Sequence, residues 1–158
     1  MGSFSRRAGQ PLGKFINPSA SASLPAYASG IQVRDAEELI GSSRNAGFRA
    51  FKVKVGFDLP TDAAATRATA SALQPGERLF TDANQAWDLA SAEMFVSKLS
   101  GCDIGWLEEP LPVDAHESDW RRLAAMSEIP LAGGENIAGY GEFKTAIGTG
   151  ALAFYQPD

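Results

Sequence analysis

The stretch FKVKVG, residues 51–56, has the alternating pattern of a β-strand and places two lysines on one of its faces. Side chains two residues apart in a strand point to the same side, so Lys52 and Lys54 face the same way. Three apolar side chains face the other way: Phe51, Val53 and Val55. The apolar face suits burial under helices, and the opposite face brings two ammonium groups to one place.

Strand and helix patterns alternate along the chain around this stretch. Strands are predicted over residues 24–29, 49–55, 78–82, 103–109, 129–135 and 151–158. Helices are predicted over residues 35–46, 61–73, 90–100, 117–127 and 140–147. Such alternation is typical of βαβ units, in which the strands are parallel and the crossovers right-handed. We therefore predict an α/β fold with about six parallel strands and an outer layer of helices.

A charged residue stands at or near the end of five predicted strands: Lys54, Asp82, Glu108, Glu135 and Asp158. The gaps between them are 28, 26, 27 and 23 residues, close to one βα unit each. Because the carboxyl ends of parallel strands lie at the same edge, these side chains are predicted to gather on one face. In a (β/α)₈ barrel that face carries the active site. The two lysines would then point into the barrel mouth and meet a ring of carboxylates.

Converging carboxylates without histidine or cysteine suit a hard cation, and Mg²⁺ fits best. Each lysine would lie near the other lysine and near a cation, and these positive charges disfavour its ammonium form. A lysine pKa of about 10.4 is therefore predicted to fall to roughly 7–8, where an amine can act as a general base. A cation and such a lysine together suit removal of a proton next to a carboxylate. Spacing alone leaves open a salt-bridge network that only holds the barrel's top layer.

Five motifs, in this order and spacing, resemble the mandelate racemase and muconate lactonizing enzyme branch of the enolase superfamily: KVKVG, TDANQAW, WLEEPLP, GGEN and QPD. The resemblance covers about residues 24–158. It implies a TIM-type barrel and a Mg²⁺-dependent lyase or isomerase that abstracts the α-proton of a hydroxy-carboxylate. Dehydration of an acid sugar is the first expected reaction, and racemisation is the second.

The resemblance implies a metal site made of three carboxylates. Asp82, Glu108 and Glu135 match the Mg²⁺ ligands of the family. The motif WLEEPLP offers two adjacent glutamates, and the choice of Glu108 over Glu109 rests on the family pattern. Strand alternation by itself does not decide between them.

The resemblance also implies roles around the substrate. Lys54 matches the general acid/base, and Lys52 matches a lysine beside the substrate carboxylate that helps to lower the pKa of its neighbour. Asn84 matches a polar contact to the substrate. Asp158 matches the aspartate of an Asp–His dyad on the opposite face of the substrate. The only histidine, His116, follows the fourth predicted strand and does not match the dyad histidine.

The chain departs from the family at both ends. Residues 1–23 are predicted to form a flexible arm, too short and too polar for the family's capping domain, and residues 24–158 an incomplete barrel. We therefore expect a truncated member whose isolated chain is inactive or severely impaired. The alternative is a non-catalytic partial barrel that assembles with another chain, as a homo-oligomer, through its exposed sheet edges.

The composition excludes several classes of protein. The chain has 158 residues, 44% of them hydrophobic, which suits one compact domain. A net charge of −5 argues against a nucleic-acid partner. The single cysteine, Cys102, excludes a disulfide framework and a cysteine-based zinc site. No run suits a membrane span or a signal peptide, so we expect a soluble, cytoplasmic protein with a small-molecule acid as its partner.

Overall fold

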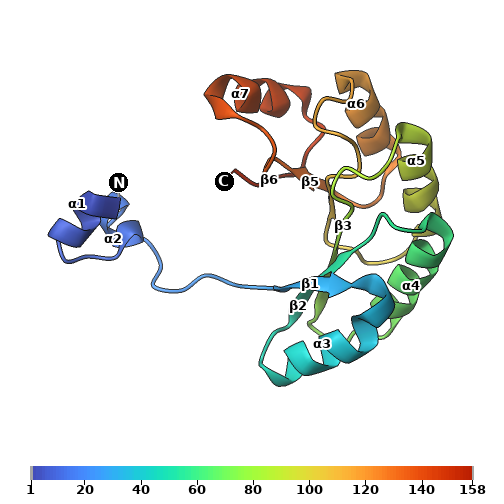
Figure 1. Cartoon of the computed structure of the whole chain (residues 1–158), viewed down its shortest axis with the longest axis horizontal. Helices are drawn as coiled ribbons and strands as arrows, with labels where there is room; N and C mark the ends of the chain where they lie inside the picture. Colours follow the sequence, from blue (N-terminus) through green and yellow to red (C-terminus); the bar gives the residue numbers. More distant parts are fainter. Residues whose placement is uncertain (1, 158) are drawn as a thin grey trace.

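Six parallel strands form one sheet in the computed structural model, which describes residues 2–157. The strands are β1 Ala28–Gln32, β2 Ala50–Lys54, β3 Arg78–Asp82, β4 Leu107–Glu108, β5 Leu131–Gly133 and β6 Phe154–Tyr155. They lie side by side in chain order, and every neighbouring pair is parallel. The sheet curves without closing (Figure 1), so β1 and β6 are its two edges. The predicted α/β partial barrel is confirmed.

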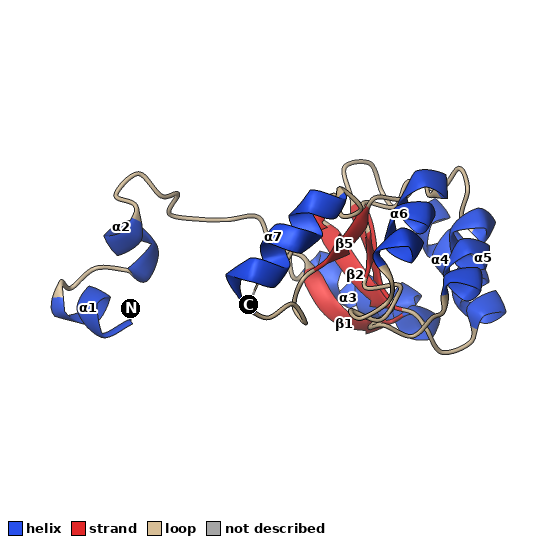
Figure 2. Cartoon of the chain, turned by 90° about the horizontal axis from the view of Figure 1, so that it is seen from above, coloured by secondary structure: helices blue, strands red, loops and turns tan. Residues whose placement is uncertain are grey.

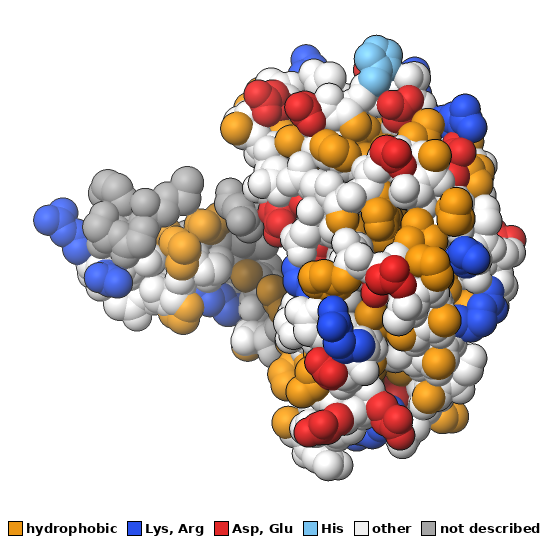
Figure 3. Space-filling view, turned by 45° about the vertical axis from the view of Figure 1, so that its right-hand side comes forward, with side chains coloured by type: hydrophobic (Ala, Val, Ile, Leu, Met, Phe, Trp, Pro, Cys, Tyr) orange, Lys and Arg blue, Asp and Glu red, His pale blue; other side chains and the backbone are white. Residues whose placement is uncertain are grey.

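The helices that follow the strands cover the outer, convex side of the sheet (Figure 1). They are the short 3-10 helix η1 Val33–Asp35, and α3 Ala36–Asn45, α4 Leu59–Ser71, α5 Leu89–Lys98, α6 Glu117–Met126 and α7 Gly139–Thr149. None of the helices in the described part of the chain is long and apolar enough to cross a membrane. Acidic and basic side chains are interspersed over the face of the molecule that Figure 3 shows.

The core lies between the sheet and these helices. Phe51 and Val53 of β2 are completely buried, and Val55 is buried beside them. They join a cluster that includes Leu79 of β3 and Phe95 of α5. The apolar face of the FKVKVG stretch therefore lies against the helices, as predicted, and its two lysines lie on the concave side of the sheet.

Two short helices, α1 Gly2–Arg7 and α2 Leu12–Ile16, precede the sheet and contact each other. They stand away from the sheet and are joined to it by an extended segment (Figures 1 and 2). Phe15 and Ile16 of α2 are exposed. The structure thus describes helices in part of the arm predicted over residues 1–23, and the flexibility of that arm stays a prediction.

The first strand is displaced from its predicted position. It was expected over residues 24–29, but β1 begins at Ala28 and ends at Gln32. The displacement buries Ile31 and leaves Leu24 83% exposed. The position of β1 in the sequence is therefore set by which residues pack against the helices, and the apolar residues of LPAYAS do not set it. The last three strands are shorter than their predicted ranges, because only two or three residues of each join the ladder.

The loop after β2 is fixed close to the end of β3. Gly56 has φ +99°, and a Cβ there would lie 2.6 Å from Cβ of Ala86 and 3.0 Å from the carbonyl oxygen of Ala83. Oδ2 of the buried Asp62 accepts hydrogen bonds from the backbone N–H groups of residues 56–58. A glycine is therefore required where the chain leaves the strand that carries both lysines.

Candidate active site

Four charged side chains meet on the concave side of the sheet, at the carboxyl ends of β2, β3 and β4. Lys54 is the register partner of Asp82, and Asp82 is the register partner of Glu108. Register partners in neighbouring parallel strands project to the same side, so these three residues form a row. Lys52 precedes Lys54 by two residues and shares its face. The predicted meeting of the lysines with carboxylates is therefore present.

The four groups form a continuous network of ion pairs. Nζ of Lys52 lies 2.6 Å from Oε1 of Glu108 and 3.0 Å from Oδ2 of Asp82. Nζ of Lys54 lies 2.7 Å from the same Asp82 oxygen and also donates a hydrogen bond to Oδ1 of Asn84. The side chains of Asp82 and Glu108 are 1% and 2% exposed, whereas that of Lys54 is 26% exposed. Lys54 therefore forms the accessible end of the network.

The network stabilises the charged forms of its buried members. Burial disfavours the charge on Lys52, but hydrogen bonds to Glu108 and Asp82 outweigh burial and raise the pKa of its ammonium group. Burial likewise opposes ionisation of Asp82, yet hydrogen bonds from Lys54 and Lys52 lower the pKa of that carboxyl. In this structure the pKa of Lys52 is raised rather than lowered, because Glu108 and Asp82 both lie within ion-pair distance of its ammonium group. The predicted fall of a lysine pKa, which depends on a bound cation, stays a prediction.

Glu108 and Glu109 point to different places, and the structure distinguishes them. Glu108 accepts hydrogen bonds from Lys52, from Nε1 of Trp106 at 3.2 Å and from Nε2 of Gln156 at 2.8 Å. Glu109 is also buried, but its oxygens accept from Nδ2 of Asn136 at 2.9 and 3.0 Å. Only Glu108 shares the network of the two lysines.

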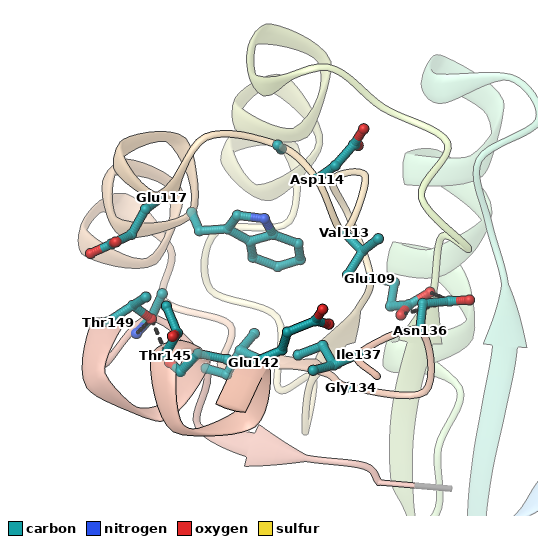
Figure 4. Close-up of a pocket in the computed structure, with 16 residues that line it drawn as sticks. Glu109, Val113, Asp114, Glu117, Gly134, Asn136, Ile137, Glu142, Thr145 and Thr149 are labelled. Carbon is teal, nitrogen blue, oxygen red and sulfur yellow. Dashed lines mark hydrogen bonds between the residues drawn. The ribbon is translucent and has the colours of Figure 1, made fainter. Parts of the chain in front are cut away.

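Glu109 and Asn136 instead line a cavity of about 440 Å³ between α6 and α7 (Figure 4). Exposed carboxylates also line it: Asp114, Glu117 and Glu142. None of the four residues of the ion-pair network contributes to its lining. The cavity is therefore separate from the strand-end cluster of Lys52, Lys54, Asp82 and Glu108, where the sequence predicts the chemistry.

Glu135 lies near the cluster without joining it. Partial burial and the negative charges of Glu109, Asp82 and Glu108 raise the pKa of the Glu135 carboxyl. Within residues 2–157, no three His, Cys, Asp or Glu side chains lie close enough together to hold one metal ion. The structure thus brings Asp82 and Glu108 together through the lysines but does not preassemble the three-carboxylate site. The Mg²⁺ ligand set stays a prediction.

Of the other residues that the sequence analysis singled out, Asn84 lies at the cluster, whereas His116 lies at the start of α6. Asn84 contacts Lys54, and its backbone N–H donates to Oδ1 of Asp82 at 3.0 Å. Asp158, the predicted dyad aspartate, lies outside the described residues. His116 caps the N-terminus of α6, is exposed, and contacts Ser118 through its ring.

Three non-glycine residues with positive φ lie in the loops beside this cluster: Asn84 at 44°, Gln85 at 63° and Glu109 at 41°. The backbone N–H of Gln85 donates to the Glu109 carbonyl at 2.7 Å, which joins the loops after β3 and β4. Strained backbone of this kind collects at functional sites when surrounding bonds hold it in place. The loops that follow β3 and β4, next to the cluster, are therefore constrained rather than free.

The sequence reasoning missed Trp106 and Gln156 as neighbours of Glu108. Trp106 precedes Glu108 by two residues, and this spacing alone could have placed both on one face of a strand. Gln156 follows β6, two strands from Glu108 in the sheet. The residue between them on β5 is Ala132, the register partner of both Glu108 and Phe154, and its small side chain leaves room for the contact.

Comparison with known proteins assigns the chain to a family. The profile of the family described as "Enolase C-terminal domain-like" matches residues 34–158. The chain belongs to this family. Its open sheet of six parallel strands with outer helices corresponds to part of a barrel, and the strand-end cluster lies at the carboxyl edge of that sheet.

Two solved structures and one curated relative illustrate the similarity of this enolase-family chain. A mandelate racemase/muconate lactonizing enzyme from Bordetella bronchiseptica RB50 is 40% identical, with a TM-score of 0.93 over 98% of the chain. An enolase from Bradyrhizobium, complexed with magnesium and mandelic acid, is 34% identical with a TM-score of 0.87, also over 98%. L-talarate/galactarate dehydratase of Salmonella typhimurium is 31% identical over 160 residues, 97% of the chain. The chain spans 42%, 44% and 39% of those three proteins, respectively.

The residues present fit the magnesium that the family implies. The donors at the cluster are carboxylate oxygens, which Mg²⁺ prefers, and they include no thiolate or imidazole. Asp82 and Glu108 are buried anions that two ammonium groups neutralise in the structure. Oε1 of Gln156, beside Glu108, is a buried acceptor with no hydrogen-bond donor among the described residues. The site thus offers anionic and neutral oxygens to a hard cation or its ligands.

Proposed function

We propose that this chain carries the site of a Mg²⁺-dependent enzyme that abstracts the α-proton of a hydroxy-carboxylate. Dehydration of an acid sugar is the first proposed reaction, and racemisation is the second. The observation that carries the proposal is the buried Asp82–Glu108 pair, bridged by Lys52 and flanked by the partly exposed Lys54. The similarity to a dehydratase of talarate and galactarate and to a complex with magnesium and mandelic acid supports the substrate class.

Asp82, Glu108 and Glu135 would hold the magnesium, which when bound would stabilise the negative charge that develops on the substrate carboxylate. Lys54 is the proposed base, because its Nζ lies at the accessible end of the network and its neutral form can accept the α-proton. Lys52 stays charged beneath it and keeps positive potential near the substrate carboxylate. The proposed role of Asn84, whose Oδ1 accepts a hydrogen bond from Nζ of Lys54, is to bond a substrate oxygen.

A second acid or base on the opposite face of the substrate is needed for turnover. The family role of Asp158 remains a proposal, and the one histidine of the sequence caps α6 rather than the strand-end cluster. We therefore infer that this chain by itself supports α-proton exchange at the Lys54 face and little or no net dehydration or racemisation.

Titration with Mg²⁺ by calorimetry tests the proposed metal site. The wild-type chain is expected to bind Mg²⁺ weakly, because Glu135 is not preassembled with the other two carboxylates. Glu108→Gln should abolish the heat of binding, because it removes an anionic ligand and keeps the size of the side chain. The matched control is Glu117→Gln on α6. Glu117 is exposed and pairs with Arg121, so its replacement should not change Mg²⁺ binding. Equal binding by wild type and Glu108→Gln would overturn the proposed site.

The open edges of the sheet favour a second candidate, a partial barrel that assembles with another copy of the chain. In the described part of the chain, β1 and β6 each pair with one strand only. Phe154 of β6 is 44% exposed on the concave side, next to Trp106. Light scattering across a concentration series is expected to show a dimer or larger species that Phe154→Asp disrupts. A strictly monomeric wild type would exclude this candidate.

A further inference from the structure

Glu108 is held by donors on both of its carboxylate oxygens. Nζ of Lys52 donates a hydrogen bond to Oε1 at 2.6 Å. Oε2 accepts hydrogen bonds from the indole N–H of Trp106 at 3.2 Å and from the side-chain amide of Gln156 at 2.8 Å. The glutamate is 2% exposed, so hydrogen bonds from water contribute little to its orientation. The three donors come from β2, from the residue before β4 and from the residue after β6. Its orientation is therefore set from several directions at once.

The indole of Trp106 is itself fixed by an aromatic floor, which we define as the rings of Tyr27 and Phe80. The Phe80 and Trp106 rings are stacked, with centroids 3.8 Å apart and planes inclined by 16°. Tyr27 meets Phe80 and Trp106 edge-on at 5.6 and 5.7 Å. Gly105 permits the stack, because a Cβ there would lie 2.3 Å from Cε1 of Phe80. The ring cannot turn away from Glu108 without breaking these contacts.

We propose that Trp106 is a positioning residue, whose indole N–H holds Glu108 in the orientation that the metal site requires. This inference rests on the proposed function, in which Glu108 is a Mg²⁺ ligand. The aromatic floor fixes the ring, the ring fixes one carboxylate oxygen, and Lys52 fixes the other. Partners of this kind orient metal ligands, and their loss weakens metal binding by about 10–100-fold.

Trp106→Phe removes the N–H and keeps an aromatic ring to stack on Phe80. We expect its Mg²⁺ affinity to fall about tenfold, with a thermal midpoint close to that of the wild type. Trp120→Phe is the matched control, because Trp120 lines the cavity between α6 and α7 and does not contact the cluster. If Trp106→Phe binds Mg²⁺ as tightly as the wild type, the positioning role is wrong while the proposed function stands.

A second readout needs no metal and separates the two proposals. In a ¹H–¹⁵N spectrum of the metal-free chain, the indole signal of Trp106 is the one lost in Trp106→Phe. We expect Glu108→Gln to shift this signal and Glu117→Gln to leave it in place, because only Glu108 accepts from that indole. A signal that does not move overturns the positioning role, whatever the metal does. If the wild type binds no Mg²⁺, the proposed function fails, and this signal alone decides whether Trp106 orients Glu108.

Discussion

Lys54→Ala is expected to abolish exchange of the substrate α-proton with solvent, a loss of about 10²–10⁴-fold for removal of a general base. Lys54 is the accessible lysine of the network, and its Nζ lies between Asp82 and Asn84. The measurement is deuterium incorporation from D₂O into galactarate or mandelate in the presence of Mg²⁺. The fold should survive, because Lys52 still neutralises Asp82 in the variant.

Lys144→Ala is the matched control, because Lys144 is exposed on α7 and should not affect exchange. Exchange that persists in Lys54→Ala would show that another group is the base. We also inferred that this chain by itself supports little or no net dehydration or racemisation. Either reaction at the rate of an ordinary enzyme, about 10 s⁻¹, would contradict that inference. It would mean that a second base exists, for example in another copy of the chain.

The fold was predictable because one spacing repeats along the chain. Lys54, Asp82 and Glu108 follow one another at nearly equal intervals, and each lies inside the hydrogen-bonded ladder at adjacent register positions. Repetition of this kind specifies which side chains share a face. It does not specify where a strand begins, because that depends on which apolar residues reach the helices. Leu24 looked like part of a strand and is exposed, whereas Ile31 is buried.

The candidate site was predictable as far as the ladder extends. Glu135 lies two residues beyond the end of β5, after Gly134 with φ +134°, so strand periodicity no longer places its side chain. The charge state of Lys52 was not predictable either, because it depends on distances to Glu108 and Asp82 that only the folded chain supplies. Contacts across strands, such as that of Gln156 with Glu108, leave no local pattern in the sequence.

Lys52→Met is expected to destabilise the fold by about 3–5 kcal/mol, the cost of removing one partner from a buried ion pair. Met has nearly the volume of Lys, so the loss is one of charge rather than of packing. Lys52 is 7% exposed and neutralises both Glu108 and Asp82. Asp82 keeps Lys54 in the variant, but Glu108 is left without a cation within ion-pair distance among the described residues. Urea unfolding at pH 7 measures the change.

The double variant Lys52→Met/Glu108→Gln should recover much of this loss, because it removes the unpaired charge as well. The control is Lys98→Met at the exposed end of α5, which should change the free energy of unfolding by less than about 0.5 kcal/mol.

The loss of stability in Lys52→Met should also depend on pH. The lowered pKa of Asp82 contributes stability that is present above the ordinary value of 3.8 and is lost as pH falls through the folded value. Lys52 is one cause of that lowering, so the gap between wild type and Lys52→Met should narrow in acid. A gap that is constant from pH 7 down to pH 3 would mean that Lys52 stabilises the sheet through its methylene groups and not through its charge.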